Sequence, residues 1–209
     1  MGSGERQVNL HIPRIAGMSA LLASIVGWVL FFVLVPTTPW IELAYGFVAT
    51  ARKLGPVVAV VLCIPLVLLS VIIHELFHAA AAKLAGAEHI ELIVSLDRIG
   101  HPISVRTPPL RRGGWERVFF YFAGPSANVM LLCIAILVME SLADIYALVH
   151  SELLMAVIRL ICGETAAVNF GLALVNLLPT GYSDGQHLQK SLRDAIRTCR
   201  ASQGIHKLK

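Results

Sequence analysis

One helix-length apolar run limits what this chain can fold into more than any other feature. Residues 56–84 form the run, and no charged side chain precedes His74 within it. Near its C-terminal end, however, the run contains His74, Glu75 and His78. An ionised group at the centre of a bilayer costs roughly 2.5–3.5 kcal/mol on insertion scales. A membrane helix that carries three ionisable side chains on adjoining turns therefore needs partners for them.

The three ionisable residues form the pattern His74-Glu75-x-x-His78. Histidines four positions apart lie on one face of a helix, about 6 Å from each other, where a single metal ion can bind both. Glu75 lies slightly off that face, so it is better placed to hold and deprotonate a water molecule than to bind the metal. The same pattern in a polar helix is often accidental, but the apolar surroundings here favour a metal site.

The composition of the chain is that of a polytopic membrane protein with a single domain. Its 209 residues are 56% hydrophobic and only 14% charged, and the mean hydropathy is +0.74, which a globular domain does not reach. We predict an all-α membrane protein in which residues 1–209 form one polytopic bundle of about four transmembrane helices. The apolar runs that are long enough to span a bilayer are at about residues 16–36, 56–84, 118–141 and 153–178.

Between the second and third runs the hydrophobic pattern changes from a helical to an alternating period. Apolar residues occupy every second position from Ile90, and the alternation resumes at Ile103. This pattern predicts a small β-hairpin within residues 88–107, with its turn at residues 97–100. The exposed edge of the hairpin could pair with an extended substrate segment. Alternatively, the hairpin only closes the cytoplasmic mouth of the bundle.

Other local signals predict interruptions and interfacial segments. Gly124-Pro125 should break or kink the start of the third run, and Gly163 should interrupt the fourth. Residues 40–51 carry an apolar stripe with helical spacing, which predicts a helix at the membrane interface. Residues 145–162 fit either an interfacial segment or part of one long, broken fourth helix.

The lysines and arginines predict the orientation of the chain. If the N-terminus is inside, 14 of the 17 basic residues are cytoplasmic and two are external, which satisfies the positive-inside rule. The hairpin and the basic tail at residues 180–209 are then cytoplasmic, as are both termini. We therefore expect a multi-pass protein of the plasma membrane, the inner membrane of a prokaryote. The net charge of +4 is explained by cytoplasmic loops, so no nucleic-acid partner is expected.

A hydrolytic zinc site needs a third protein ligand and an open position. The fourth run ends at Pro179, and Asp184 follows it. The second and fourth helices are parallel in this topology, so their C-terminal ends reach the same side of the membrane. Asp184 reaches the depth of His74 only if Pro179 and Gly181 break the helix and the chain folds back. His187 is close enough in sequence to be a rival ligand.

Together these motifs resemble the site-2 protease family of intramembrane zinc metalloproteases, over roughly residues 56–190. The matching motifs, in family order and spacing, are His74-Glu75-x-x-His78, Gly124-Pro125-x-x-Asn128, and Asn176-x-x-Pro179 with Asp184-Gly185. The resemblance implies that one zinc ion per chain is bound by His74, His78 and Asp184. It implies that Glu75 is the catalytic general base and acid. It also implies that Asn128 and Asn176 lie near the substrate or line the site.

The function implied by the resemblance is that of an intramembrane zinc endopeptidase. Zinc-activated water would hydrolyse a peptide bond within or near a transmembrane segment of a membrane protein or peptide in the lipid bilayer. One alternative is a membrane zinc transporter, which needs ligands at several depths, whereas the candidates here lie at one depth. Another is a non-proteolytic homologue that binds membrane segments, which would not need Glu75. A homo-oligomer is compatible with the sequence.

Overall fold

A computed structural model describes residues 6–37, 52, 55–94, 103–108, 110, 114–181 and 183–206. Within these ranges, 4 helices are long and apolar enough to span a membrane, which confirms the predicted all-α polytopic bundle. They are α1 (Arg14–Thr37), α3 (Pro56–Leu84), α4 (Trp115–Glu140) and α6 (Glu152–Leu177). Two further helices are the short α5 (Leu142–Val149) and the amphipathic α7 (Asp184–His206). The helix predicted at residues 40–51 lies outside the described residues.

Helix α4 is the central helix of the bundle. Of its most apolar window, 61% is buried, compared with 28% for α1 and α6 and 17% for α3. Its side chains Val129, Leu132 and Ile136 pack in one core cluster with Ala166 and Ala173 of α6. The outer faces of α1, α3 and α6 carry large exposed apolar side chains, which is the pattern expected where helices face lipid.

A small antiparallel sheet caps one end of the bundle. It contains β1 (Arg6–Asn9), β2 (Glu91–Val94) and β3 (Ile103–Arg106), in the order β1-β2-β3. The pairing of β2 with β3 confirms the two strands of the predicted hairpin, while its turn lies outside the described residues. Strand β1 was not predicted, because Val8 is the one apolar residue among its four. Strand β3 lies at an edge of the sheet and contacts α3.

The predicted helix breaks at Gly124-Pro125 and at Gly163 are wrong. Helix α4 runs through Gly124-Pro125 without a break, and α6 runs through Gly163. In a packed membrane bundle, neighbouring groups can satisfy the backbone carbonyl that a proline leaves free, so a proline does not have to end a helix. Residues 145–162 are divided between α5 and the first turns of α6, so the break falls at His150 rather than within the spanning helix.

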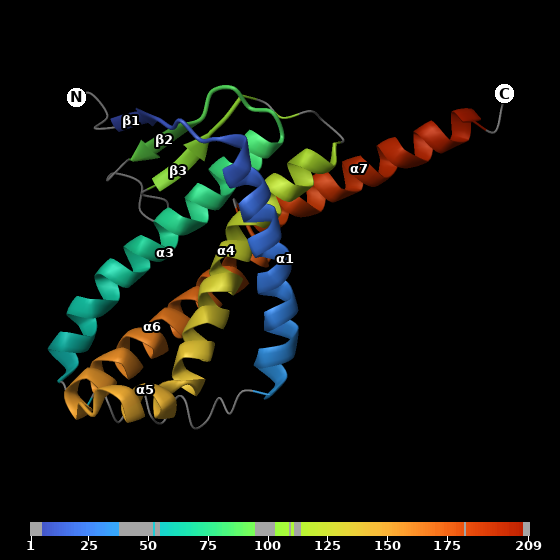
Figure 1. Ribbon diagram of the computed structural model, residues 1–209. Coiled ribbons are helices and arrows are strands. Elements are labelled where there is room, and N and C mark those ends of the chain that lie inside the picture. The colour runs from blue at the N-terminus through green and yellow to red at the C-terminus, as the bar shows by residue number, and fades with distance from the viewer. Residues whose placement is uncertain are drawn as a thin grey trace.

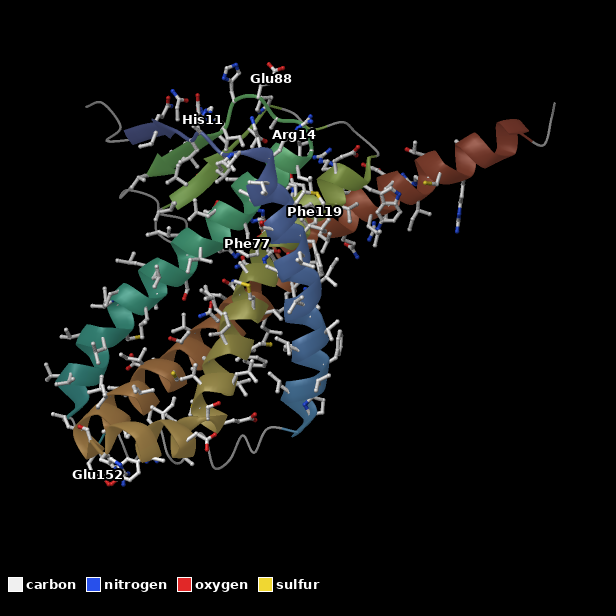
Figure 2. The ribbon with its side chains drawn as sticks, viewed as in Figure 1. His11, Arg14, Phe77, Glu88, Phe119 and Glu152 are labelled. Atoms are coloured by element: carbon white, nitrogen blue, oxygen red, sulfur yellow. The ribbon has the colours of Figure 1, made fainter. Side chains whose placement is uncertain are left out.

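The sheet and α7 lie at the same end of the bundle, and α5 lies at the opposite end (Figure 1). Helix α7 starts against the bundle and points away from it. Polar side chains gather at the two ends: His11, Arg14 and Glu88 are near the sheet, and Glu152 is near α5 (Figure 2). An apolar middle between two polar ends is the arrangement of an integral membrane protein.

Candidate metal centre

Three side chains from α3 and α7 meet at one point. Nε2 of His74 lies 3.1 Å from Nε2 of His78 and 3.1 Å from Oδ2 of Asp184, and the last two atoms are 3.2 Å apart. The two histidines are only 6% and 4% exposed. Among the described residues, these three form the one group of His, Cys, Asp or Glu side chains whose ligand atoms are close enough to share a metal ion. The structure therefore brings together the three ligands predicted from the sequence.

The hydrogen bonds of His78 show that the group suits a cation. Nδ1 of His78 lies 2.6 Å from the backbone carbonyl of Phe120 on α4. A carbonyl can only accept, so Nδ1 carries the hydrogen and Nε2 of the neutral ring offers a lone pair to the centre. Asp184 likewise offers a carboxylate oxygen. These atoms are spaced close to the roughly 3.3 Å expected between tetrahedral ligands of zinc with bonds of about 2.0–2.1 Å.

Asn128 lies behind His74. Its Nδ2 is 3.1 Å from Nδ1 of His74, and its Oδ1 is buried without a hydrogen-bond partner. Turning the amide by 180° places Oδ1 where it accepts a hydrogen from Nδ1, and Nε2 of His74 is then free to bind a metal. In that orientation Asn128 fixes the tautomer of His74 whose Nε2 can bind a metal. Asn128 thus contacts His74 and does not line the cavity described below.

The space around the two histidines depends on Gly124 of α4. A Cβ atom at this position would overlap Nε2 of His78 and would lie only 2.5 Å from Nε2 of His74. The glycine of the Gly124-Pro125 motif therefore gives the imidazole rings room to meet. The sequence predicted that the motif breaks the helix. In the structure its glycine instead leaves space for the two rings.

Asp184 is the first residue of α7, and the local sequence fixes it there. Helix α6 ends at Leu177, and Gly181 adopts φ +56°, so the chain turns back as expected from Pro179 and Gly181. The hydroxyl of Ser183 accepts hydrogen bonds from the backbone N–H groups of Thr180 and Gln186, which caps α7.

Two further features describe the surroundings of Asp184. A Cβ atom at Gly185 would overlap the carbonyl of Leu177, so the first turn of α7 lies directly against the end of α6. Burial alone would raise the pKa of Asp184, but the positive charge of His78, when that ring is protonated, and the hydrogen bonds to both histidines hold this pKa well below its usual range. The carboxylate is therefore ionised, as a metal ligand must be.

His187 occupies a different position from the one a rival ligand would take. Its ring stacks on the ring of Tyr121 from α4, with centroids 4.9 Å apart and an interplanar angle of 16°. The guanidinium carbon of Arg117 lies 5.9 Å from the Tyr121 ring centroid. His187 lines the cavity but is not part of the His-His-Asp group.

Glu75 faces the same centre from α3 and contacts the sheet. Its Oε2 accepts a hydrogen bond of 2.9 Å from the backbone N–H of Val105 in β3. This N–H therefore points away from β2, so the edge of β3 opposite to β2 faces the metal centre. Glu75 is not a member of the His-His-Asp group. This is the arrangement expected of a base that does not bind the metal.

A cavity of about 680 Å³ opens beside the cluster. Its lining combines the three candidate ligands and Glu75 with β3 and the last turns of α6. Asn176, predicted to line the site, is part of this wall. The sequence reasoning missed the roles of Val105, Phe120 and Tyr121, which act through a backbone atom or a ring and leave no pattern. Ser183 could have been found, because a serine directly before a helix signals a cap.

Four membrane-length helices and a largely buried His-His-Asp group define an integral membrane protein with a candidate metal centre. The chain matches the family model described as Peptidase M50B-like over residues 44–178. It belongs to this family, which confirms the resemblance to the site-2 proteases. The match contains His74, Glu75 and His78 but ends before Asp184, so the third ligand rests on the geometry. Neither the curated proteins nor the solved structures that were compared gave a match.

Proposed function

We propose that the protein is an intramembrane zinc endopeptidase that cuts a peptide bond within or near a transmembrane segment of a membrane protein or peptide. The observation that carries this proposal is the meeting of three ligand atoms from α3 and α7 beside the Glu75 carboxylate in one cavity. Membership of the Peptidase M50B-like family supports the proteolytic chemistry. Each of the three candidate ligands and Glu75 is within a helix or at its first residue, so elements of the fold bring them together.

In this proposal each residue of the centre has a defined task. His74, His78 and Asp184 would hold one zinc ion, since hydrolytic zinc sites use three protein ligands. When bound, zinc lowers the pKa of a coordinated water toward 7 and polarises the scissile carbonyl. Glu75 takes a proton from the attacking water and then gives it to the leaving amine. The N–H of Val105 holds one oxygen of Glu75, which leaves the other oxygen for this proton transfer.

The sheet supplies a means of binding the substrate. A transmembrane helix hides its carbonyls in its own hydrogen bonds, so the segment to be cut must unwind. An extended segment can pair with the edge of β3 that faces away from β2, through backbone groups other than the Val105 N–H, which is bonded to Glu75. This edge lines the cavity through Ile103, Ser104 and Val105. This arrangement supports the substrate-binding role of the hairpin over a role as a simple plug, because the edge faces Glu75.

We also propose that the sheet and α7 are cytoplasmic and that the protein resides in the inner membrane of a prokaryote. The sheet and α7 lie at one end of the bundle (Figure 1), and most of the basic residues belong to segments at that end. This distribution supports the orientation through the positive-inside rule. A homo-oligomer stays compatible with this arrangement.

The experiment that tests the function compares Glu75→Gln with the wild type in zinc content and in cleavage of a panel of single-span reporter proteins. We expect one zinc per chain in both proteins, and cleavage by the wild type alone. Glutamine keeps the size of the side chain but cannot take the proton, and loss of a general base costs about 10²–10⁴-fold in rate. Glu164→Gln is the matched control, because Glu164 is a buried acid of α6 outside the cavity, and it should cleave normally.

Three outcomes would contradict the proposal. A Glu75→Gln protein without zinc would make Glu75 a ligand, as in a zinc transporter. A Glu75→Gln protein that keeps both zinc and near-normal cleavage would show that the hydrolysis takes place elsewhere. A zinc-loaded wild type that binds the reporter spans without cutting any of them would favour the non-proteolytic homologue.

A further inference from the structure

We propose that the stacked rings of Tyr121 and His187 position Asp184 as the third metal ligand, so that α4 serves as the template on which α3 and α7 meet. The inference rests on the proposed zinc site. It makes Tyr121 and His187 positioning residues and removes His187 from the set of candidate ligands. The evidence comes from the way α7 is attached to the rest of the bundle.

The start of α7 is attached to α6 at one point. Ser183 caps the helix, and Gly185 lies directly against the Leu177 carbonyl. One point of attachment fixes where a helix begins, but it does not fix the direction of its axis or which face it presents to α3. With this attachment alone, the Asp184 carboxylate could point in several directions. A second contact is therefore needed before Asp184 can point at His74 and His78.

Helix α7 packs along α4, and the ring stack is the part of this packing that lies next to Asp184. His187 follows Asp184 by three residues, so the two side chains lie on the same face of α7. The stack of His187 on Tyr121 therefore turns this face toward α4, with ring centroids 4.9 Å apart. Arg117 lies 5.9 Å from the Tyr121 ring centroid, within the range of a cation–π contact. Both partners are half-buried side chains at the wall of the cavity.

The same segment of α4 also organises the histidines. Phe120, next to Tyr121, accepts the hydrogen bond from Nδ1 of His78 through its carbonyl, and Gly124 leaves room for both imidazoles. Within about one turn of α4, Phe120 and Gly124 thus contact the α3 histidines, and Tyr121 contacts α7. A rigid, largely buried helix that contacts all the ligand-bearing elements gives the ligands a common reference.

The test measures zinc affinity by competition with a chelator on the monodisperse detergent-solubilised protein. We expect Tyr121→Ala and His187→Ala each to weaken zinc binding about tenfold, the lower end of the effect of losing an outer contact to a metal ligand. Tyr121→Phe and His187→Phe keep a ring and should stay within about twofold of the wild type. The Tyr121→Ala/His187→Ala double variant should bind zinc about as weakly as either single variant, because the two rings form one contact. Tyr146→Ala in α5 is the control aromatic and should have no effect.

His187→Phe separates the two roles of His187. If His187 were a ligand, phenylalanine would weaken zinc binding as strongly as Asp184→Ala does, and this result would overturn the inference. Wild-type affinity in both Tyr121→Ala and His187→Ala would overturn it as well. Either result leaves the proposed protease intact as long as the wild type binds zinc and cuts. A wild type that binds no zinc would instead contradict the proposed function itself.

Discussion

Helices α3 and α7 both supply metal ligands, but they do so by different physical means. Helix α3 carries His74 and His78 four residues apart inside a continuous helix, so the helical repeat alone places both rings on one face. Helix α7 carries Asp184 at its first residue, where no repeat fixes its direction. Its position depends on the turn at Gly181, the Ser183 cap and contacts with α4 and α6.

This difference shows which ligand positions resist a disturbance and which can shift. On α3, a disturbance must break a well-ordered helix or push the rings apart before the ligands separate. On α7, any of several weak contacts can move the carboxylate while the helix itself survives. We therefore expect that changes near α3 act through steric exclusion with large effects, and that changes near α7 act through positioning with graded effects.

The largest effect is expected for Gly124→Ala, which acts on the α3 ligands. The added Cβ would overlap Nε2 of His78 and crowd Nε2 of His74, so the rings cannot keep their positions. Stoichiometric zinc should be lost, while the helical circular dichroism of the protein stays unchanged, since alanine favours a helix over glycine by about 1 kcal/mol. Zinc content after gel filtration measures the outcome.

Gly171→Ala is the matched control for that substitution. Gly171 lies inside α6, and a Cβ atom there would meet no other atom within 4 Å. This variant should keep one zinc per chain and the wild-type stability or slightly more. If Gly124→Ala also kept its zinc, α4 would not limit the space around the histidines. Steric exclusion would then not distinguish the α3 ligands from the α7 ligand.

A smaller effect is expected for Asn128→Ala, which leaves the ligands in place but removes the support of His74. Outer-shell partners of metal-bound histidines typically contribute 10–100-fold in affinity, so zinc affinity should fall by about that factor. Asn169→Ala is the control, because Asn169 donates to Ser70 and joins α6 to α3 without a hydrogen bond to any residue of the cluster. It should lower the thermal midpoint and leave zinc affinity unchanged. Equal losses of zinc affinity in both variants would point to general packing rather than to support of His74.

Much of this architecture could be predicted from the sequence because it is encoded locally. The four spanning helices follow from apolar length, and the His74–His78 pair follows from helical spacing within one of them. The strands β2 and β3 follow from alternation. Asp184 could be proposed because Pro179 and Gly181 mark the end of α6, although the meeting itself is a tertiary event across more than a hundred residues.

The errors and omissions concern features that only packing decides. Backbone propensity suggested that Gly124-Pro125 would break the helix. Instead the helix continues, and Gly124 leaves space for two imidazole rings. Val105 and Phe120 act through backbone atoms, which any residue type would supply. The stack of Tyr121 on His187 joins two helices whose relative placement no single-sequence pattern contains. Strand β1 is too short and too polar to be distinguished from a loop.

The smallest effect is expected for Ser183→Ala, and it is the most direct test of graded positioning on α7. The Ser183 hydroxyl accepts from Thr180 and Gln186, and removal of a serine cap costs about 0.5–2 kcal/mol. The first turn of α7 should then open more often. Because Asp184 is in that turn, part of this cost appears as zinc affinity weakened by about threefold to tenfold. Ser183→Thr retains a capping hydroxyl and should bind zinc nearly as well as the wild type. Thr198→Ala removes a hydroxyl that bonds only to the backbone of α7 far from the centre and should have no effect. If Ser183→Ala removed zinc as fully as Gly124→Ala, the placement of Asp184 would be all-or-none, and the distinction between a fixed α3 and an adjustable α7 would have to be abandoned.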